Sequence, residues 1–281
     1  MPDHDYGQKA PMENDAMVRT LDAQARAIWP QERGFIKHLF TRPGLEVLDV
    51  GCGTGEIAVR VMREFSPGHV TGIDLAETHI RRARERVKNN TGFTFEQGDA
   101  HKLPFDNDRF DVSLCRHMLQ AIPDPRGVIR EMIRVVKPGG WLYYLAEDYG
   151  MLFFHPTKYD MDEFFGAYGG KASEKAGSDL RQGRKMPALL ASLKCADIEV
   201  NYLCIDTLRV DRTLMAEIFT HWRDGFEEWI STNSGKPLRD VRNRFDDMID
   251  CAKGKEGYAA WLIPSISARV TDESKQSIRK Q

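Results

Sequence analysis

Residues 45–149 alternate short apolar runs with amphipathic stretches of helical period, and this alternation constrains the fold more than any other feature of the sequence. Short runs that are mostly apolar are typical of strands buried on both faces of a sheet. Strands separated by helical stretches of ~10–15 residues form βαβ units, which build a doubly wound α/β fold with helices on both faces of a parallel sheet. We expect strands at residues 45–50, 69–73, 93–97, 110–115 and 141–146, and helices at 56–65, 76–90 and 125–136.

The composition excludes several classes of protein. The 281 residues include 40 basic and 42 acidic side chains, so the net charge of −2 does not indicate a nucleic-acid partner. No apolar run approaches the ~18–20 residues of a membrane helix, and the first residues lack the basic and apolar regions of a signal peptide. The five cysteines are scattered without a CxxC pair, which argues for free thiols and against a zinc site. We therefore expect a cytoplasmic protein without a metal, a nucleic-acid partner or a membrane contact.

A glycine-rich loop, VLDVGCGTG (47–55), follows the first predicted strand. Glycines at a strand-to-helix junction allow a tight turn and a close approach of ligand to backbone. The spacing is G-x-G-x-G, with Glu56 where a dinucleotide fingerprint has its third glycine, and the G-K-[ST] end of a phosphate-binding loop is absent. Asp49 beside the loop disfavours a pyrophosphate and suits a ligand with positive charge. The alternative is a tight turn without a ligand.

Two further aspartates follow predicted strands. Asp74 ends the second strand, where a carboxylate can accept both hydroxyls of a ribose; alternatively it caps the next helix. Asp99 ends the third strand, where it can accept a hydrogen bond from an adenine amine; alternatively it is a turn residue. Together with the glycine-rich loop, these positions favour a nucleoside ligand.

Residues 45–149 resemble the core of class I (Rossmann-like) S-adenosylmethionine-dependent methyltransferases. The matching segments are VLDVGCGTG (47–55), GID (72–74), GDAHKLPF (98–105), FDVSLCRHMLQAIPDP (110–125) and VVKPGG (135–140). The resemblance implies a seven-stranded, mostly parallel sheet whose last strand is antiparallel. Residues 198–207 and 258–270 can supply strands six and seven, which the family joins by a short connection. Residues 208–257 are therefore interpreted as a helical insertion.

The resemblance also implies which residues hold S-adenosylmethionine. The glycines of the loop would line the methionine part, with Asp49 near its amino group. Asp74 would bind the ribose, Leu75 would pack on the adenine, and Asp99 and Ala100 would contact its edge. The full set is Gln24, Asp49, Gly51, Cys52, Gly53, Gly55, Asp74, Leu75, Asp99, Ala100, Arg116 and His117, with Trp29 beside Gln24 on an N-terminal helix.

The domain prediction is an N-terminal helical cap at residues 1–44 and a methyltransferase domain at 45–281, with lid segments at about 150–178 and 208–257. Within the cap, apolar positions of helical spacing predict a helix at 17–29 that Pro30 ends, and a second helix at 31–40. The insertion carries an aromatic row at Trp222, Phe226 and Trp229. We expect this row to be core, with a substrate wall as the alternative.

Side chains that face the methyl acceptor should follow strands four and five, because the ligand crevice of such sheets lies at the carboxyl ends of the strands. The first of these strands presents Arg116, His117 and Gln120, and the second presents Glu147 and Asp148 followed by Tyr149. His117 is a candidate general base or a structural hydrogen-bonding residue. Glu147 and Asp148 are candidates for binding an amine acceptor, or are solvated loop acids.

The sequence thus predicts an enzyme that transfers a methyl group in line from S-adenosylmethionine to a small-molecule acceptor, as a monomer or homodimer. One alternative is a catalytically inactive S-adenosylmethionine-binding regulator or scaffold, which a filled acceptor pocket would favour. Another is a nicotinamide-dependent oxidoreductase, against which Glu56 argues. The acceptor atom and the use of a base are left open.

Overall fold

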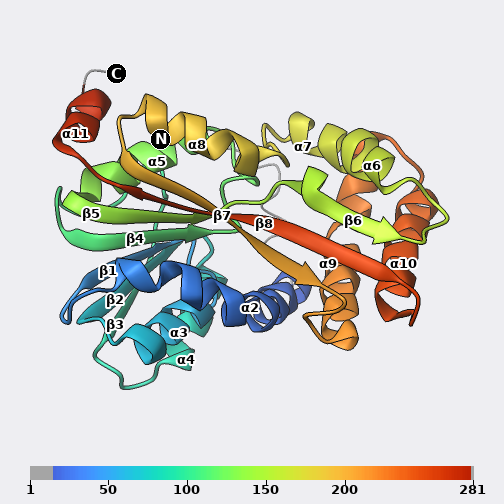
Figure 1. Ribbon diagram of the computed structural model, residues 1–281, viewed down its shortest axis with the longest axis horizontal. Helices are drawn as coiled ribbons and strands as arrows, with labels where there is room; N and C mark the ends of the chain where they lie inside the picture. The colour runs from blue at the N-terminus through green and yellow to red at the C-terminus, as the bar shows by residue number, and fades with distance from the viewer. Residues whose placement is uncertain (1–14, 280–281) are drawn as a thin grey trace.

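The computed structural model describes residues 15–279, which form an eight-stranded sheet between two layers of helices (Figure 1). The first 14 residues of the predicted cap lie outside the described residues. The strand order is β3-β2-β1-β4-β5-β8-β6, and β7 also pairs with β8. The strands are β1 Glu46–Val50, β2 His69–Asp74, β3 Phe93–Gln97, β4 Phe110–Arg116, β5 Val136–Leu145, β6 Leu152–His155, β7 Ala196–Asp206 and β8 Tyr258–Arg269. The predicted doubly wound, mostly parallel fold is confirmed.

Each face of the sheet has its own hydrophobic core. Successive side chains of a strand point to opposite faces, so Val47 of β1 joins one core and its neighbour Leu48 joins the other. The first core contains Trp29, Ile57 and Ile80, which come from α2 Asp15–Ile36, α3 Glu56–Phe65 and α4 Glu77–Arg86. The second is covered by α5 Pro125–Val135, α8 Gln182–Ser192 and α11 Asp272–Arg279. The predicted helices in the 45–149 segment therefore occur where their apolar faces meet the sheet.

The sheet has one strand more than the seven that the resemblance implies. Strand β8 is 12 residues long and extends beyond the end of β5. Its first residues pair with β6, a strand of four residues with the antiparallel register Leu152↔Trp261 to His155↔Tyr258. Because β6 is so short, its sequence shows no alternation from which a strand could be predicted.

Helix α2 runs from Asp15 to Ile36 without a break, so the prediction that Pro30 ends the first helix is wrong. A proline inside a helix removes a hydrogen bond and costs about 3 kcal/mol. Tertiary contacts on both sides of Pro30 compensate. Gln31 donates from Nε2 to the Cys204 carbonyl (2.7 Å) and accepts from the Cys204 N–H (3.1 Å), while Ile28 and Trp29 are buried. A short 3-10 helix, η1 Lys37–Leu39, follows.

The two segments predicted as lids pack together at one end of the sheet, around β6 and the first half of β8 (Figure 1). Helices α9 and α10 also pack against each other, and α9 contacts both α2 and α7. The elements are η2 Tyr149–Met151, α6 Met161–Glu163, the π-helix η3 Phe164–Gly170, α7 Lys171–Lys175, α9 Arg212–Ser234 and α10 Leu238–Lys253. This cluster places aromatic residues beside the carboxyl ends of β4 and β5.

Candidate functional site

The loop after β1 is shaped by glycines with positive φ. Gly51 has φ +71° and Gly53 has φ +52°, values that L side chains rarely adopt. A Cβ atom on Gly51 would lie 2.7 Å from Met118 Sδ, and one on Gly53 would lie 2.9 Å from Leu21 Cδ1. The N–H groups of Gly51 and Cys52 donate to the Ile73 carbonyl, which fastens the loop to β2. The loop therefore presents bare backbone to the space beside it.

That space is a cavity of about 920 Å³, including its open mouth, at the carboxyl ends of β1 to β4. Asp74 lies at its rim, where Oδ2 accepts from Gly53 N–H (2.8 Å) and Oδ1 from Ala76 N–H (3.0 Å). This carboxylate thus holds the glycine loop and the start of α4 while facing the cavity. The wall includes Leu21, Gly51, Gly53, Ile73, Asp74, Leu75, His79, Asp99, Ala100, His101, Arg116, His117, Met118 and Ile122.

Asp49 is a buried carboxylate at the base of the loop, and its Oδ2 has no hydrogen-bond partner among the described residues. Burial raises the pKa of Asp49 from 3.8 to about 7. Arg116 opposes this effect, whereas Asp74 and Glu32 add to it by charge repulsion. An unsatisfied buried carboxylate favours a cationic ligand, which would stabilise its ionised form.

Arg116, at the end of β4, lies next to Asp49 in the same wall. Its guanidinium makes two hydrogen bonds to the buried Glu32 of α2, at 2.6 and 2.7 Å. The Tyr143 hydroxyl donates to the same carboxylate at 3.0 Å. The side chain predicted to face the cofactor is therefore also the anchor of the N-terminal helix, a role that the sequence did not indicate.

Of the other residues predicted to bind the cofactor, four line the large cavity or a recess next to it, and three lie elsewhere. Leu75 and Ala100 line the large cavity, as does Asp99, whose Oδ1 accepts from the His101 N–H at 2.8 Å. Cys52 lines a smaller recess beside Asp49. The remaining three lie elsewhere. Gly55 is the N-cap of α3, and a Cβ atom on it would lie 2.9 Å from Phe95; Trp29 is in the core, and Gln24 lines a second cavity.

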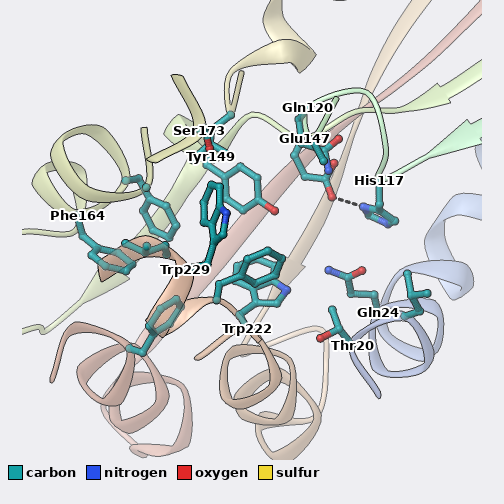
Figure 2. Close-up of a pocket in the computed structure, with 18 residues that line it drawn as sticks. Thr20, Gln24, His117, Gln120, Glu147, Tyr149, Phe164, Ser173, Trp222 and Trp229 are labelled. Atoms are coloured by element: carbon teal, nitrogen blue, oxygen red, sulfur yellow. Dashed lines mark hydrogen bonds and ion pairs between the residues drawn. The ribbon is translucent and has the colours of Figure 1, made fainter. Parts of the chain in front are cut away.

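The second cavity, of about 800 Å³ with its mouth, adjoins the first and is mainly aromatic (Figure 2). Residues Leu21, His117 and Ala121 belong to the walls of both cavities. The predicted aromatic row of α9 packs against the core and also forms part of this wall. The aromatic lining is Tyr149, Phe164, Phe165, Trp222, Phe226, Trp229 and Phe245, and the polar lining includes Thr20, Gln24, Gln120, Glu147 and Ser173.

His117 stands between the two cavities and is held by Glu147 (Figure 2). The ring nitrogen Nδ1 forms a hydrogen bond with Glu147 Oε1. The backbone N–H of His117 donates to the Leu145 carbonyl at 2.9 Å. An ionised carboxylate only accepts hydrogen bonds, so in the neutral form of the imidazole that fits this contact Nδ1 is the donor and Nε2 is an acceptor. Neither Nε2 of His117 nor Oε2 of Glu147 has a partner among the described residues. This pair can take a proton from a bound molecule.

Asp148, which was predicted together with Glu147, does not line either cavity. It is buried, its carboxylate forms two hydrogen bonds with the Arg184 guanidinium, and its Oδ1 accepts from Gly150 N–H. Adjacent residues after a strand point to opposite sides, so only one of the two acids can reach the cavity. Arg184, on α8, is the residue that holds Asp148.

No group of three or more His, Cys, Asp or Glu side chains within residues 15–279 is arranged to hold a metal ion. Over the same range, none of the helices is long and apolar enough to span a bilayer. The five cysteines are free.

A large cavity at the carboxyl ends of a doubly wound sheet, with acidic side chains near the ends of β1 and β2 and after β3, is typical of Rossmann-like proteins that bind a nucleoside. Residues 41–174 match the family model described as a methyltransferase domain. This match, over slightly less than half of the chain, confirms the predicted methyltransferase domain and supports the resemblance to class I S-adenosylmethionine-dependent methyltransferases, with S-adenosylmethionine as the expected cofactor.

The curated relatives include demethylmenaquinone methyltransferases of Listeria welshimeri and Staphylococcus aureus. The first is 35% identical over 142 residues, which cover 50% of this chain and 59% of the relative. The second is 30% identical over 143 residues, which cover 50% of this chain and 58% of the relative. The match thus spans less than two thirds of these relatives, and it includes only half of the chain described here.

Solved structures share the fold at low sequence identity. Phosphoethanolamine N-methyltransferase 2 of Haemonchus contortus, in complex with phosphomonomethylethanolamine and S-adenosylhomocysteine, has a TM-score of 0.59 and 20% identity, over 94% of this chain and 60% of that one. The [4+2]-cyclase SpnF has a TM-score of 0.55 and 21% identity, over 94% and 97%. Since these neighbours are named for different reactions, the fold alone does not specify the chemistry.

The affinity for S-adenosylmethionine is expected to rise as the pH increases from about 5.5 to about 7.5, because a cationic ligand binds the ionised form of Asp49. The gain approaches tenfold per pH unit well below the pKa of about 7. Unfolding free energy should change in the opposite direction, falling as the pH rises from about 4 to about 7, because the folded state retains a proton that the unfolded state releases. Titration calorimetry in two buffers measures the proton released on binding.

Asp49→Asn is the control for this prediction, because it removes the titrating group and keeps the shape. The variant should bind S-adenosylmethionine more weakly and lose most of the proton release. Unchanged proton release in Asp49→Asn would show that a group other than Asp49 releases the proton.

Proposed function

We propose that this protein transfers a methyl group from S-adenosylmethionine to a neutral, largely apolar small molecule whose reacting group is deprotonated by His117. One observation carries the proposal: the nucleoside cradle and an open aromatic cavity share a wall, and the unpartnered Nε2 of His117 belongs to that wall. An inactive regulator would not need a second open cavity of about 800 Å³ beside the cradle.

The cofactor-binding residues follow from the charges of the cradle. Asp49 would take the amino group and Arg116 the carboxylate of the methionine part, against the backbone of Gly51, Cys52 and Gly53. Asp74 has free lone pairs for a ribose, since each of its oxygens accepts one backbone N–H. Leu75, Asp99 and Ala100 would enclose the adenine. When bound, S-adenosylmethionine supplies a sulfonium methyl group for in-line transfer to a nucleophile, with S-adenosylhomocysteine as the leaving group.

His117 and Glu147 would prepare that nucleophile. His117 Nε2 takes the proton of the acceptor, and Glu147 keeps the imidazole in the required tautomer and stabilises its protonated form. Burial holds the pKa of Tyr149 well above its usual range, so this hydroxyl stays protonated and can donate to the acceptor. The aromatic wall excludes water from the reacting atoms.

The acceptor is proposed to be neutral because both acids after β5 already have a partner in the protein. Asp148 forms an ion pair with Arg184, and one carboxylate oxygen of Glu147 forms a hydrogen bond with His117. A small-molecule acceptor is also supported by the relatives, which are named demethylmenaquinone methyltransferases. The free cysteines support a reducing, cytoplasmic setting. The segments 150–178 and 208–257 are proposed as lids because both contribute residues to the aromatic cavity.

The test combines cofactor binding with turnover. In titration calorimetry, Asp74→Ala should weaken binding of S-adenosylmethionine at least tenfold, since it removes the ribose contact and frees Gly53 N–H. Asp250→Ala, at an exposed acid of α10, is the matched control. Formation of S-adenosylhomocysteine is then measured with two acceptors, β-naphthol and 2-naphthylmethylamine, of which the second is a cation at neutral pH. Turnover of the amine alone would contradict the neutral acceptor, and tight cofactor binding without turnover of any acceptor would favour the regulator.

A further inference from the structure

Four residues of the aromatic cavity end in buried polar atoms that lack a hydrogen-bond partner within the described chain. They are His117 Nε2, Gln120 Oε1, Glu147 Oε2 and Ser173 Oγ. The proposed proton transfer accounts for two of these atoms, which belong to the base His117 and its partner Glu147. Gln120 and Ser173 have no role in the proton transfer, although both side chains are more than nine-tenths buried.

The backbone carbonyls of Gln120 and Ser173 both accept hydrogen bonds from neighbouring segments. The Gln120 carbonyl accepts from Asp179 N–H at 3.1 Å. The Ser173 carbonyl accepts from the N–H of Ser178 at 2.9 Å and from its hydroxyl at 3.1 Å. These bonds join the loop after β4 to the loop after α7 and bring both side chains to the cavity. The backbone therefore holds both side chains at the cavity, while Gln120 Oε1 and Ser173 Oγ make no hydrogen bond within the described chain.

Figure 2 shows Gln120 and Ser173 on the same side of the cavity as Glu147, with the aromatic rings extending away from them. A buried polar group without a partner costs about 1–3 kcal/mol, so an apolar residue would stabilise the free protein more. The cost is recovered only when a bound molecule supplies the missing hydrogen bonds. Both a carboxamide and a hydroxyl can donate and accept, which suits a hydroxyl or carbonyl group on that molecule.

We infer that the methyl acceptor carries a second oxygen substituent next to its reacting group, and that Gln120 and Ser173 recognise it. This inference rests on the proposed function, because the proposed function is what places the reacting group of the acceptor at His117. The substrate class is thus a ring-containing molecule with two neighbouring polar groups at one end and an apolar body among the aromatic side chains. Gln120 and Ser173 are specificity-determining residues, since a site with buried hydrogen-bonding groups rejects analogues that leave them unpaired.

The test compares β-naphthol with a naphthalenediol that has two adjacent hydroxyls on one ring. Binding is measured by calorimetry on the protein saturated with S-adenosylhomocysteine, and turnover is measured with S-adenosylmethionine. The diol should bind at least about tenfold more tightly than β-naphthol. Gln120→Leu should reduce this ratio to below about threefold, and Ser173→Ala should reduce it part of the way.

Matched controls are Gln276→Leu on α11 and Ser192→Ala on α8, both at exposed positions. Neither should change the ratio. Equal affinity and equal kcat/KM of the wild-type protein for the two probes would overturn the inference and leave the proposed function standing. The inference is also overturned if both cavity variants retain the full preference for the diol. Failure to bind either probe would contradict the aromatic acceptor and, with it, the inference.

Discussion

Replacing His117 with asparagine is expected to lower kcat for methyl transfer by about 10²–10⁴-fold, the usual contribution of a positioned general base. The residue has φ +54°, in the left-handed region that asparagine tolerates better than most residues. The variant should therefore fold, and its loss of activity can be assigned to the missing base. Steady-state kinetics should show a much smaller change in the KM for the acceptor than in kcat.

His69→Asn is the matched control, because its ring lies on β2 and bonds Thr94 away from both cavities. It should keep wild-type kcat. Glu147→Gln tests the positioning role: it should lower kcat less than His117→Asn and change the pH dependence of kcat. If His117→Asn turns over the acceptor as fast as the wild type does, the proton leaves by another route and the proposed base is wrong.

Replacing Glu32 with alanine is expected to reduce the free energy of unfolding by about 3–5 kcal/mol, because it leaves the buried guanidinium of Arg116 without its carboxylate. Glu32 is fully buried, and the Arg116 side chain is only 8% exposed. The change also removes the acceptor for the Tyr143 hydroxyl. Urea unfolding of the two proteins, with equal m values, measures the difference.

The exposed ion pair between Arg33 and Glu64 provides the control for this prediction. Glu64→Ala should change the free energy of unfolding by less than about 1 kcal/mol. Should Glu32→Ala fail to fold, Tyr143→Phe removes the hydroxyl that bonds both Glu32 and Ser265 and should cost about 1–2 kcal/mol. A loss in Glu32→Ala no larger than in Glu64→Ala would show that the buried pair does not stabilise the fold.

The fold of residues 45–149 could be predicted from the sequence because its signals are local. Gly51 and Gly53 allow the positive φ angles of the loop after β1, and Asp74 ends β2. The type and the sequence position of each of these residues therefore indicate the local structure without knowledge of distant contacts. The acceptor half depends on contacts between distant segments. Ser173 reaches the cavity only because α7 packs on α9, and Glu147 becomes the partner of His117 only because β4 and β5 end side by side.

The same distinction explains the errors. Pro30 was interpreted from its local effect on a helix, whereas Gln31 and its bonds to Cys204 of β7 maintain the helix from outside. Strand β6 exists because β8 extends past β5 and offers it an edge. Glu32 carried no visible signal, because its role depends on Arg116, 84 residues away in the chain.

The tryptophans of the aromatic cavity give the protein an intrinsic optical reporter. Trp222 and Trp229 belong to the cavity wall, and Trp261 lies behind Trp222 with ring centroids 5.1 Å apart. Of the five tryptophans in the chain, these three therefore respond to what fills the cavity, while Trp29 and Trp141 pack elsewhere. Emission from the unlabelled protein should follow acceptor binding in real time, so the order in which the two ligands bind can be measured by stopped-flow mixing.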